Sequence, residues 1–126
     1  MLVIRDAQLA VFGRIHLEEF VRRAIAHVRA CFAAQAADLG DEGVERSVRT
    51  ALDRCRQYAL PSEGDVLRYL NLMYALGFDF DADPALAWAG ETLRDAELEA
   101  ATKLGLLAQR AAQVLAARER AQEAAR

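Results

Sequence analysis

The 126-residue chain is poor in residues that interrupt or cross-link a polypeptide: it has two prolines, seven glycines and two cysteines. An all-β domain needs a turn roughly every ten residues, so this small supply of proline and glycine argues against all-β architectures. Two cysteines are also too few for a scaffold held together by disulfides. The shortage of turn residues therefore favours long, uninterrupted elements.

The chain also lacks an excess of positive charge and any long apolar run. Its formal net charge is −3, and nucleic-acid binding depends on neutralising phosphates, so we expect no nucleic-acid partner. No apolar run approaches the ~18 residues of a membrane span, and the start MLVIRDAQL carries a charge too early for a secretory leader. The expected location is the cytoplasm, with no membrane partner.

Hydrophobic residues make up 54% of the chain, and they recur at the three- and four-residue steps of amphipathic helices. The spacing predicts helices over about 5–32, from about 41 to 59 and over 63–76, then a short helix that begins at Pro84 and a long last helix capped by Asp95. Loops are expected at 34–41, 60–62 and 77–83. We predict an all-α, bundle-like single domain over 1–126 with four to five helices and a frayed or projecting segment from about residue 117.

Boundary signals are clearest around the third helix. Ser62 and Asp65 are spaced as a capping box, and Gly77 is expected just past the end of the helix. Apolar residues cover this helix almost all round, which places it centrally in the core. Asp83 and Pro84 predict the start of the next helix, with the aspartate as N-cap and the proline at the first helical position.

The segment DFDADP contains three alternating carboxylates, those of Asp79, Asp81 and Asp83, which are weak candidates for metal ligands. An EF-hand loop starting at Asp79 requires glycine at position six and glutamate at position twelve, and these are Pro84 and Gly90. A second interpretation is structural, in which Asp83 caps a helix and the other two bind turn amides. A third is an acidic partner-binding knob.

Alternation in this segment also predicts the direction of its aromatic side chains. In an extended segment neighbouring residues point to opposite sides. We therefore expect Phe78, Phe80 and Trp88 to be largely buried, and Asp79 and Asp81 to face solvent or turn amides.

His27 and Cys31 are four residues apart, so they share a helical face. Two ligands do not complete a zinc site, and Cys55 is a third only if the first two helices bring it close. Core packing of both cysteines is the favoured interpretation. No nucleophile motif, phosphate-binding loop or HExxH is present, so we expect no enzyme, no catalytic residue and no cofactor.

The pattern S-E-x-D-V-x-R-Y-x-x-L-M-x-x-L-G-x-D-F-D-x-D-P, from Ser62 to Pro84, resembles a family of small all-helical bacterial proteins. Members are often encoded beside tip-spike, PAAR and effector genes of type VI secretion systems. The resemblance also includes VIRDAQ and LGDEGV and spans about Val3 to Leu107. It implies an accessory role such as effector loading, effector folding or immunity, and it implies no catalytic residue.

Two functions of different class follow. The first is a non-enzymatic protein-interaction module, an adaptor or chaperone for a secreted bacterial effector. Its expected partner-binding residues are Asp79, Asp81, Ala108, Ala111, Ala112 and Leu115. The same alanine-rich face is also suited to a homodimer or to completing the core, and we expect a two-fold dimer through the first or last helix. The alternative is a small metal-binding protein or enzyme that uses Asp79, Asp81 and Asp83, with His27 as a further ligand.

Overall fold

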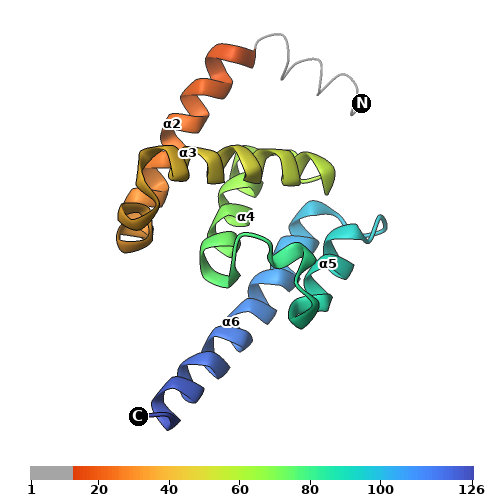
Figure 1. Cartoon of the computed structure of the whole chain (residues 1–126). Coiled ribbons are helices and arrows are strands. Elements are labelled where there is room, and N and C mark those ends of the chain that lie inside the picture. Colours follow the sequence, from red (N-terminus) through yellow and green to blue (C-terminus); the bar gives the residue numbers. More distant parts are fainter. Residues whose placement is uncertain (1–12) are drawn as a thin grey trace. The chain divides into compact units, whose positions relative to one another are not determined.

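The computed structural model describes residues 13–126, with side chains from residue 16 onwards. Within this range it contains five α-helices, two 3₁₀ helices and no strand (Figure 1). The α-helices are α2 (Gly13–Cys31), α3 (Ala33–Gln57), α4 (Glu63–Leu76), α5 (Ala87–Arg94) and α6 (Ala100–Ala124), and the 3₁₀ helices are η1 (Phe80–Ala82) and η2 (Pro84–Leu86). The predicted all-α fold is confirmed.

The residues form two compact units, one up to Arg49 and one from Thr50 to Arg126, and α3 contributes to both. The single domain expected over 1–126 stays a prediction.

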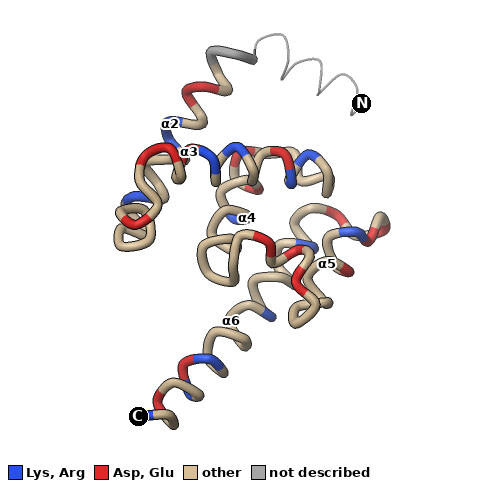
Figure 2. Tube along the Cα trace, in the orientation of Figure 1, with Lys and Arg blue, Asp and Glu red and all other residues tan. Residues whose placement is uncertain are grey.

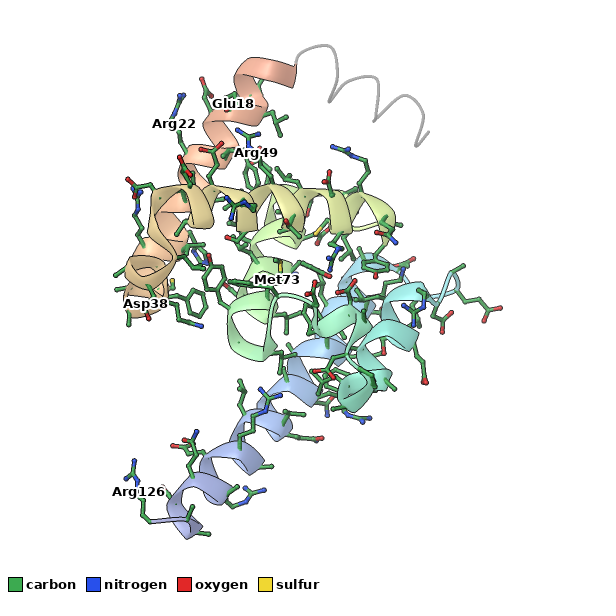
Figure 3. All side chains as sticks on the ribbon, in the orientation of Figure 1. Glu18, Arg22, Asp38, Arg49, Met73 and Arg126 are labelled. Atoms are coloured by element: carbon green, nitrogen blue, oxygen red, sulfur yellow. The ribbon has the colours of Figure 1, made fainter. Side chains whose placement is uncertain are left out.

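In the first unit, α2 and α3 each bury one face. The buried residues are Phe20, Val21, Ala24 and Val28 on α2 and Ala36, Val44, Ser47 and Val48 on α3. Two exposed ion pairs link the helices: Arg49 donates to Glu18 at 3.1 Å (Figure 3), and Arg29 donates to Asp41. Exposed pairs contribute ~0–1 kcal/mol, so these two ion pairs add little to the stability of the unit.

The loop predicted over 34–41 is wrong. The helix resumes at Ala33 and has a single break at Gly40, where φ is 75° and ψ is 172°. The alanines in this stretch are the strongest helix formers, and they outweigh the stop signal expected before Asp41. Only glycine adopts the Gly40 conformation at little cost, so the break is confined to that residue. The part of the predicted first helix that precedes residue 13 lies outside the described residues.

In the second unit, α4 is the most buried helix and packs against α6. It covers Glu63–Leu76, the predicted range, and both halves of the capping box form. The Asp65 amide donates to the Ser62 hydroxyl at 3.0 Å, and the Ser62 amide donates to the Asp65 carboxylate at 3.1 Å. The buried residues lie all round the helix: Asp65, Val66, Tyr69, Leu70, Leu72, Met73, Tyr74 and Leu76.

The helix ends and starts predicted from Gly77 onwards are confirmed only in part. Gly77 ends α4, and its amide donates to the Met73 carbonyl at 2.9 Å. Asp83 accepts from the Ala85 amide at 2.9 Å, but it caps η2 rather than α5. The prediction that Asp95 caps the last helix is wrong, because Asp95 accepts from the Glu97 amide in a separate turn and α6 begins after Glu99.

The second half of α6 extends well beyond its last buried residue. That residue is Ala111, whereas the helix continues to Ala124 and every residue from Ala117 onwards is exposed. Figure 3 shows Arg126 at the free end of this helix. The alanine-rich sequence favours a helix here without burial, because alanine has the highest helix propensity.

The end of α3 offers a test of backbone strain. Ala59 has φ 59°, and the Leu60 amide donates to the Cys55 carbonyl at 2.8 Å, the bond of a Schellman turn. A left-handed alanine costs ~1–2 kcal/mol, and glycine returns part of this as chain entropy. We expect Ala59→Gly to raise the free energy of unfolding by ~0.5–1 kcal/mol in urea titrations. The control Ala108→Gly, in the exposed middle of α6, should lower it by ~1 kcal/mol. Equal losses in both variants would contradict the strain at Ala59.

Candidate functional site

Two aspartates of DFDADP, Asp79 and Asp81, form ion pairs with an arginine at the end of α3. Arg54 of α3 donates to Asp81 at 2.6 Å and to Asp79 at 3.2 Å. Asp83 caps η2 and takes no part in this cluster. The alternative metal site would therefore require a cation to displace a guanidinium from Asp79 and Asp81.

Asp81 is the buried centre of the cluster. Its side chain is 6% exposed, and each carboxylate oxygen has its own donor. Arg54 donates to Oδ1, and the Tyr58 hydroxyl donates to Oδ2 at 2.5 Å. Asp79, by contrast, is 82% exposed. Arg54 therefore binds two different carboxylates: that of Asp81 is buried and accepts a hydrogen bond on each oxygen, and that of Asp79 is exposed to solvent.

The expectation that Phe78 is buried and that Asp81 faces solvent or turn amides is wrong. Phe78 is 37% exposed, with its ring against Tyr74 at a centroid distance of 5.0 Å, and Trp88 is only half-buried. Phe80 is buried as predicted. The segment forms the 3₁₀ helix η1 instead of an extended strand, so side chains follow a period of three rather than two.

Close packing holds η1 in place. A side-chain carbon added at Gly90 of α5 would lie 2.6 Å from the Asp81 carbonyl oxygen. Only glycine permits α5 to approach the backbone of η1 this closely. The position of Asp81 is thus set by contact with α5 as well as by the bonds from α3.

Tyr69 of α4 lies beside this cluster, and its ring packs on Phe80 at a centroid distance of 5.1 Å. Its hydroxyl is buried and has no hydrogen-bond partner among the described residues. Burial raises the pKa of Tyr69 well above its ordinary value, and Asp81 adds to the rise. Arg54 opposes the rise but is not in hydrogen-bonding geometry with the hydroxyl.

Lys103, the one lysine of the sequence, is a buried residue that sequence analysis missed. Its ammonium donates to the Tyr58 carbonyl at 2.9 Å, and so it caps the end of α3 from the first turn of α6. The signal was present in the sequence: Lys103 lies one turn before the buried Leu107, on the core stripe of the helix. Its role is to tie α6 to α3.

The buried thiol and phenol groups of the second unit predict that the folded protein becomes less stable at alkaline pH. Burial raises the pKa of the Cys55 thiol, with a contribution from Asp65. Burial and then the hydrogen bond to Asp81 raise the pKa of Tyr58, while Arg94 and Arg54 lower it. Well below pH ~8.5, the ordinary pKa of a cysteine thiol, these groups are protonated in both states, so their stabilisation is complete. Above that pH the unfolded chain releases its protons first, so the free energy of unfolding falls as pH rises.

We expect urea titrations from pH 8 to 11 to show a loss of up to ~1.4 kcal/mol per pH unit for each group that has titrated in the unfolded chain alone. In Cys55→Ala the loss should begin only near pH ~10, where unfolded tyrosines titrate. A free energy of unfolding that stays constant across this range would contradict the burial of Cys55, Tyr58 and Tyr69.

The His27–Cys31 pair forms, but not in the core. The Cys31 sulfur lies 3.8 Å from His27 Nδ1, and Cys31 is exposed, contrary to the core packing that we expected. Cys55 is buried, as that interpretation requires. No three His, Cys, Asp or Glu side chains of residues 16–126 are grouped as a metal site requires.

The predicted partner-binding residues divide between surface and core. Asp79, Ala108, Ala112 and Leu115 are exposed, whereas Asp81 and Ala111 are buried and present no side chain to a partner. Ala111 lies on the face of α6 that also buries Leu104 and Leu107. The face available to a partner is therefore that of Ala108, Ala112 and Leu115, here called the Leu115 face.

A shallow surface depression lies on α2. It is lined by Glu19, Arg22, Arg23 and Ala26. Because all four belong to successive turns of one helix, they form an open surface rather than an enclosure for a small molecule. The described helices include none with the length and apolarity of a membrane span.

Comparisons with protein-family models, curated proteins and solved structures give no match.

Proposed function

We propose that this chain is a non-enzymatic protein-interaction module, acting in the bacterial cytoplasm as an adaptor or chaperone for a secreted effector. The class of partner comes from the resemblance of the Ser62–Pro84 segment to proteins encoded beside type VI secretion genes. The choice of surface is supported by the exposure of residues on α6. Its main support is the second half of α6, which is held in a helix without being buried by its own unit.

The second half of α6 has the properties of a helix that contacts another protein. Leu115 is 38% exposed although it is large and apolar. Ala112 and Ala108 lie on the same side, one and two turns before Leu115 respectively, and their small side chains permit close approach of a second helix. Exposed apolar residues on one side of an unsupported helix are typical of interaction surfaces.

The size of this surface favours a partner larger than a second α6. The thirteen residues from Ala112 to Ala124 span ~20 Å at 1.5 Å per residue. A helix ~10 Å wide then offers a projected contact of ~200 Å² on one side. A specific interface buries ~800 Å² per partner, so pairing of two such segments alone falls short. A partner that covers more of the helix meets this requirement more readily.

The test is affinity purification of the tagged full-length chain from its native bacterium, with recovered proteins identified by mass spectrometry. We expect an effector or a secretion component, and we expect Ala112→Glu together with Leu115→Glu to reduce its recovery at least tenfold. Gln113→Glu is the control for added charge, because it introduces one of the two negative charges of the double variant at an exposed position on another side of α6. Recovery of no secretion-related protein, or equal recovery with the double variant, would exclude this function.

The sequence also predicts self-association through the first or last helix, and a dimer formed through α6 would compete for the Leu115 face. Light scattering at micromolar concentration distinguishes it, since a dimer has twice the monomer mass of 13.9 kDa. A dimer that dissociates in the Ala112→Glu/Leu115→Glu variant would assign the Leu115 face to a second copy. A monomer leaves it available to the effector.

A further inference from the structure

A tryptophan of α5 and an arginine of α6 form a cation–π contact at the surface. The Arg110 guanidinium carbon is 5.1 Å from the centroid of the Trp88 ring. Trp88 is half-buried and Arg110 is exposed. Within residues 16–126 no carboxylate forms an ion pair with Arg110, so its N–H donors have no charged acceptor there.

Leu106 extends this surface along α6. It is 41% exposed, the largest exposed fraction among the large hydrophobic residues of the described part. It precedes Arg110 by four residues, so the two side chains share one face of the helix. Trp88, Leu106 and Arg110 together are here called the Trp88 surface.

The Trp88 surface is distinct from the Leu115 face. Leu106 and Leu115 are nine residues apart, which at 100° per residue places them on opposite sides of α6. A partner bound to one side leaves the other side accessible. A substitution on the Trp88 surface therefore leaves the proposed effector contact of Ala112 and Leu115 in place.

The chemistry of these residues specifies what the surface can bind. Cation–π contact with the Trp88 ring restricts the guanidinium of Arg110, and a guanidinium matches a carboxylate through two parallel hydrogen bonds. Trp and Arg are also the residue types most enriched among those that dominate binding energy at protein interfaces. Leu106 adds an apolar contact on the same helical face. The three residues together fit a carboxylate that lies close to an apolar side chain.

We propose that the Trp88 surface docks a segment of a partner protein in which an acidic residue lies within one helical turn of a large apolar residue. This extends the proposed function, because it assigns a second contact surface and the chemistry that it recognises. A nucleic acid would offer phosphates to Arg110, but the chain carries a net charge of −3, and Figure 2 shows acidic residues interspersed with basic ones along the helices, which disfavours that partner.

The test uses the full-length chain and a library of random twelve-residue peptides displayed on phage. We expect the selected peptides to contain Asp or Glu within four positions of Leu, Ile, Phe or Met. Because Trp88 is the one tryptophan of the chain, its fluorescence reports docking at this site directly. Synthetic copies of the selected peptides should shift its emission as they saturate the protein.

Variants then separate the surface from its surroundings. Arg110→Gln should weaken the peptides at least tenfold, and Arg110→Lys should weaken them nearly as much because it keeps the charge but loses the planar fork. Leu106→Ser should also weaken them. Arg118→Gln, which removes a charge from the exposed end of α6, should leave the affinity unchanged.

The proposal would be overturned if no selected peptide binds the unchanged protein more tightly than the Arg110→Gln variant. Selected peptides without acidic residues, or binding that leaves Trp88 emission unchanged, would also overturn it. Binding of single-stranded oligonucleotides that depends on Arg110 would assign the surface to a nucleic acid and would also overturn it. Circular dichroism of each variant checks that the helices are intact. None of these results bears on effector recovery through the Leu115 face, so the two proposals fail separately.

Discussion

Replacing Phe80 by alanine is expected to lower the free energy of unfolding by ~3–5 kcal/mol, the usual cost of removing a fully buried aromatic ring. Phe80 is 1% exposed, and its ring packs on that of Tyr69. The short helix η1, which carries Phe80, is held at Asp81 by the ion pair with Arg54 and by the close approach of Gly90, so its backbone has little freedom to close the cavity. Urea titration with a common m-value measures the loss.

Phe78→Ala is the matched control, because it removes the same ring two residues earlier. Phe78 is 37% exposed and contacts Tyr74 edge to face. We expect its removal to cost ~1 kcal/mol or less, since little apolar area returns to water. Equal losses in the two variants would contradict the burial of Phe80 and the exposure of Phe78.

Replacing Asp81 by asparagine is expected to lower the free energy of unfolding by ~2–4 kcal/mol. Removing one partner of a buried ion pair typically costs ~3–5 kcal/mol, because the remaining charge is left uncompensated. The expected loss is smaller here because the Arg54 side chain is 26% exposed and water compensates part of its charge. Tyr58 can still donate to the asparagine oxygen, whereas Arg54 loses a charged acceptor.

Asp79→Asn provides a control on the same guanidinium. Its carboxylate is 82% exposed, and exposed ion pairs contribute ~0–1 kcal/mol. The two losses should also respond differently to salt, because mobile ions screen exposed charges far more than buried ones. Raising NaCl from 0.05 to ~1 M should abolish the effect of Asp79→Asn and leave most of that of Asp81→Asn. A loss at Asp81 that disappears in salt would contradict the burial of its carboxylate.

The elements that sequence analysis predicted correctly depend on interactions between near neighbours. The capping box of α4 involves residues three apart, and the bond from the Ala85 amide to Asp83 involves residues two apart. Such contacts form within one helical turn, so the spacing of residue types is enough to reveal them. The period of apolar residues likewise predicted that α4 is buried on nearly all sides.

The errors arose where a local rule competed with another local rule or with packing. The stop signal near Gly40 predicted an eight-residue loop over 34–41. In the structure the helix-forming alanines keep this segment helical, and only Gly40 departs from helical geometry. At η1 the alternation of Phe and Asp suggested an extended segment, whereas the chain folds into a 3₁₀ helix that buries Asp81 beside Phe80. Nothing in residues 78–83 indicates that Arg54 and Tyr58, more than twenty positions earlier, would compensate a buried carboxylate.

The amino-acid sequence by itself determined the all-α class, the limits of α4 and the helical caps around it, because helix period and capping depend on residues within a few positions of one another. The tertiary structure alone decided which charges are buried. Asp81 and Lys103 are both inside, the first bound by Arg54 and Tyr58 and the second by the Tyr58 carbonyl. The physical reason is that burial of a charge is favourable only when distant partners compensate its lost hydration, and partners 45 positions apart, such as Tyr58 and Lys103, meet only in the folded chain.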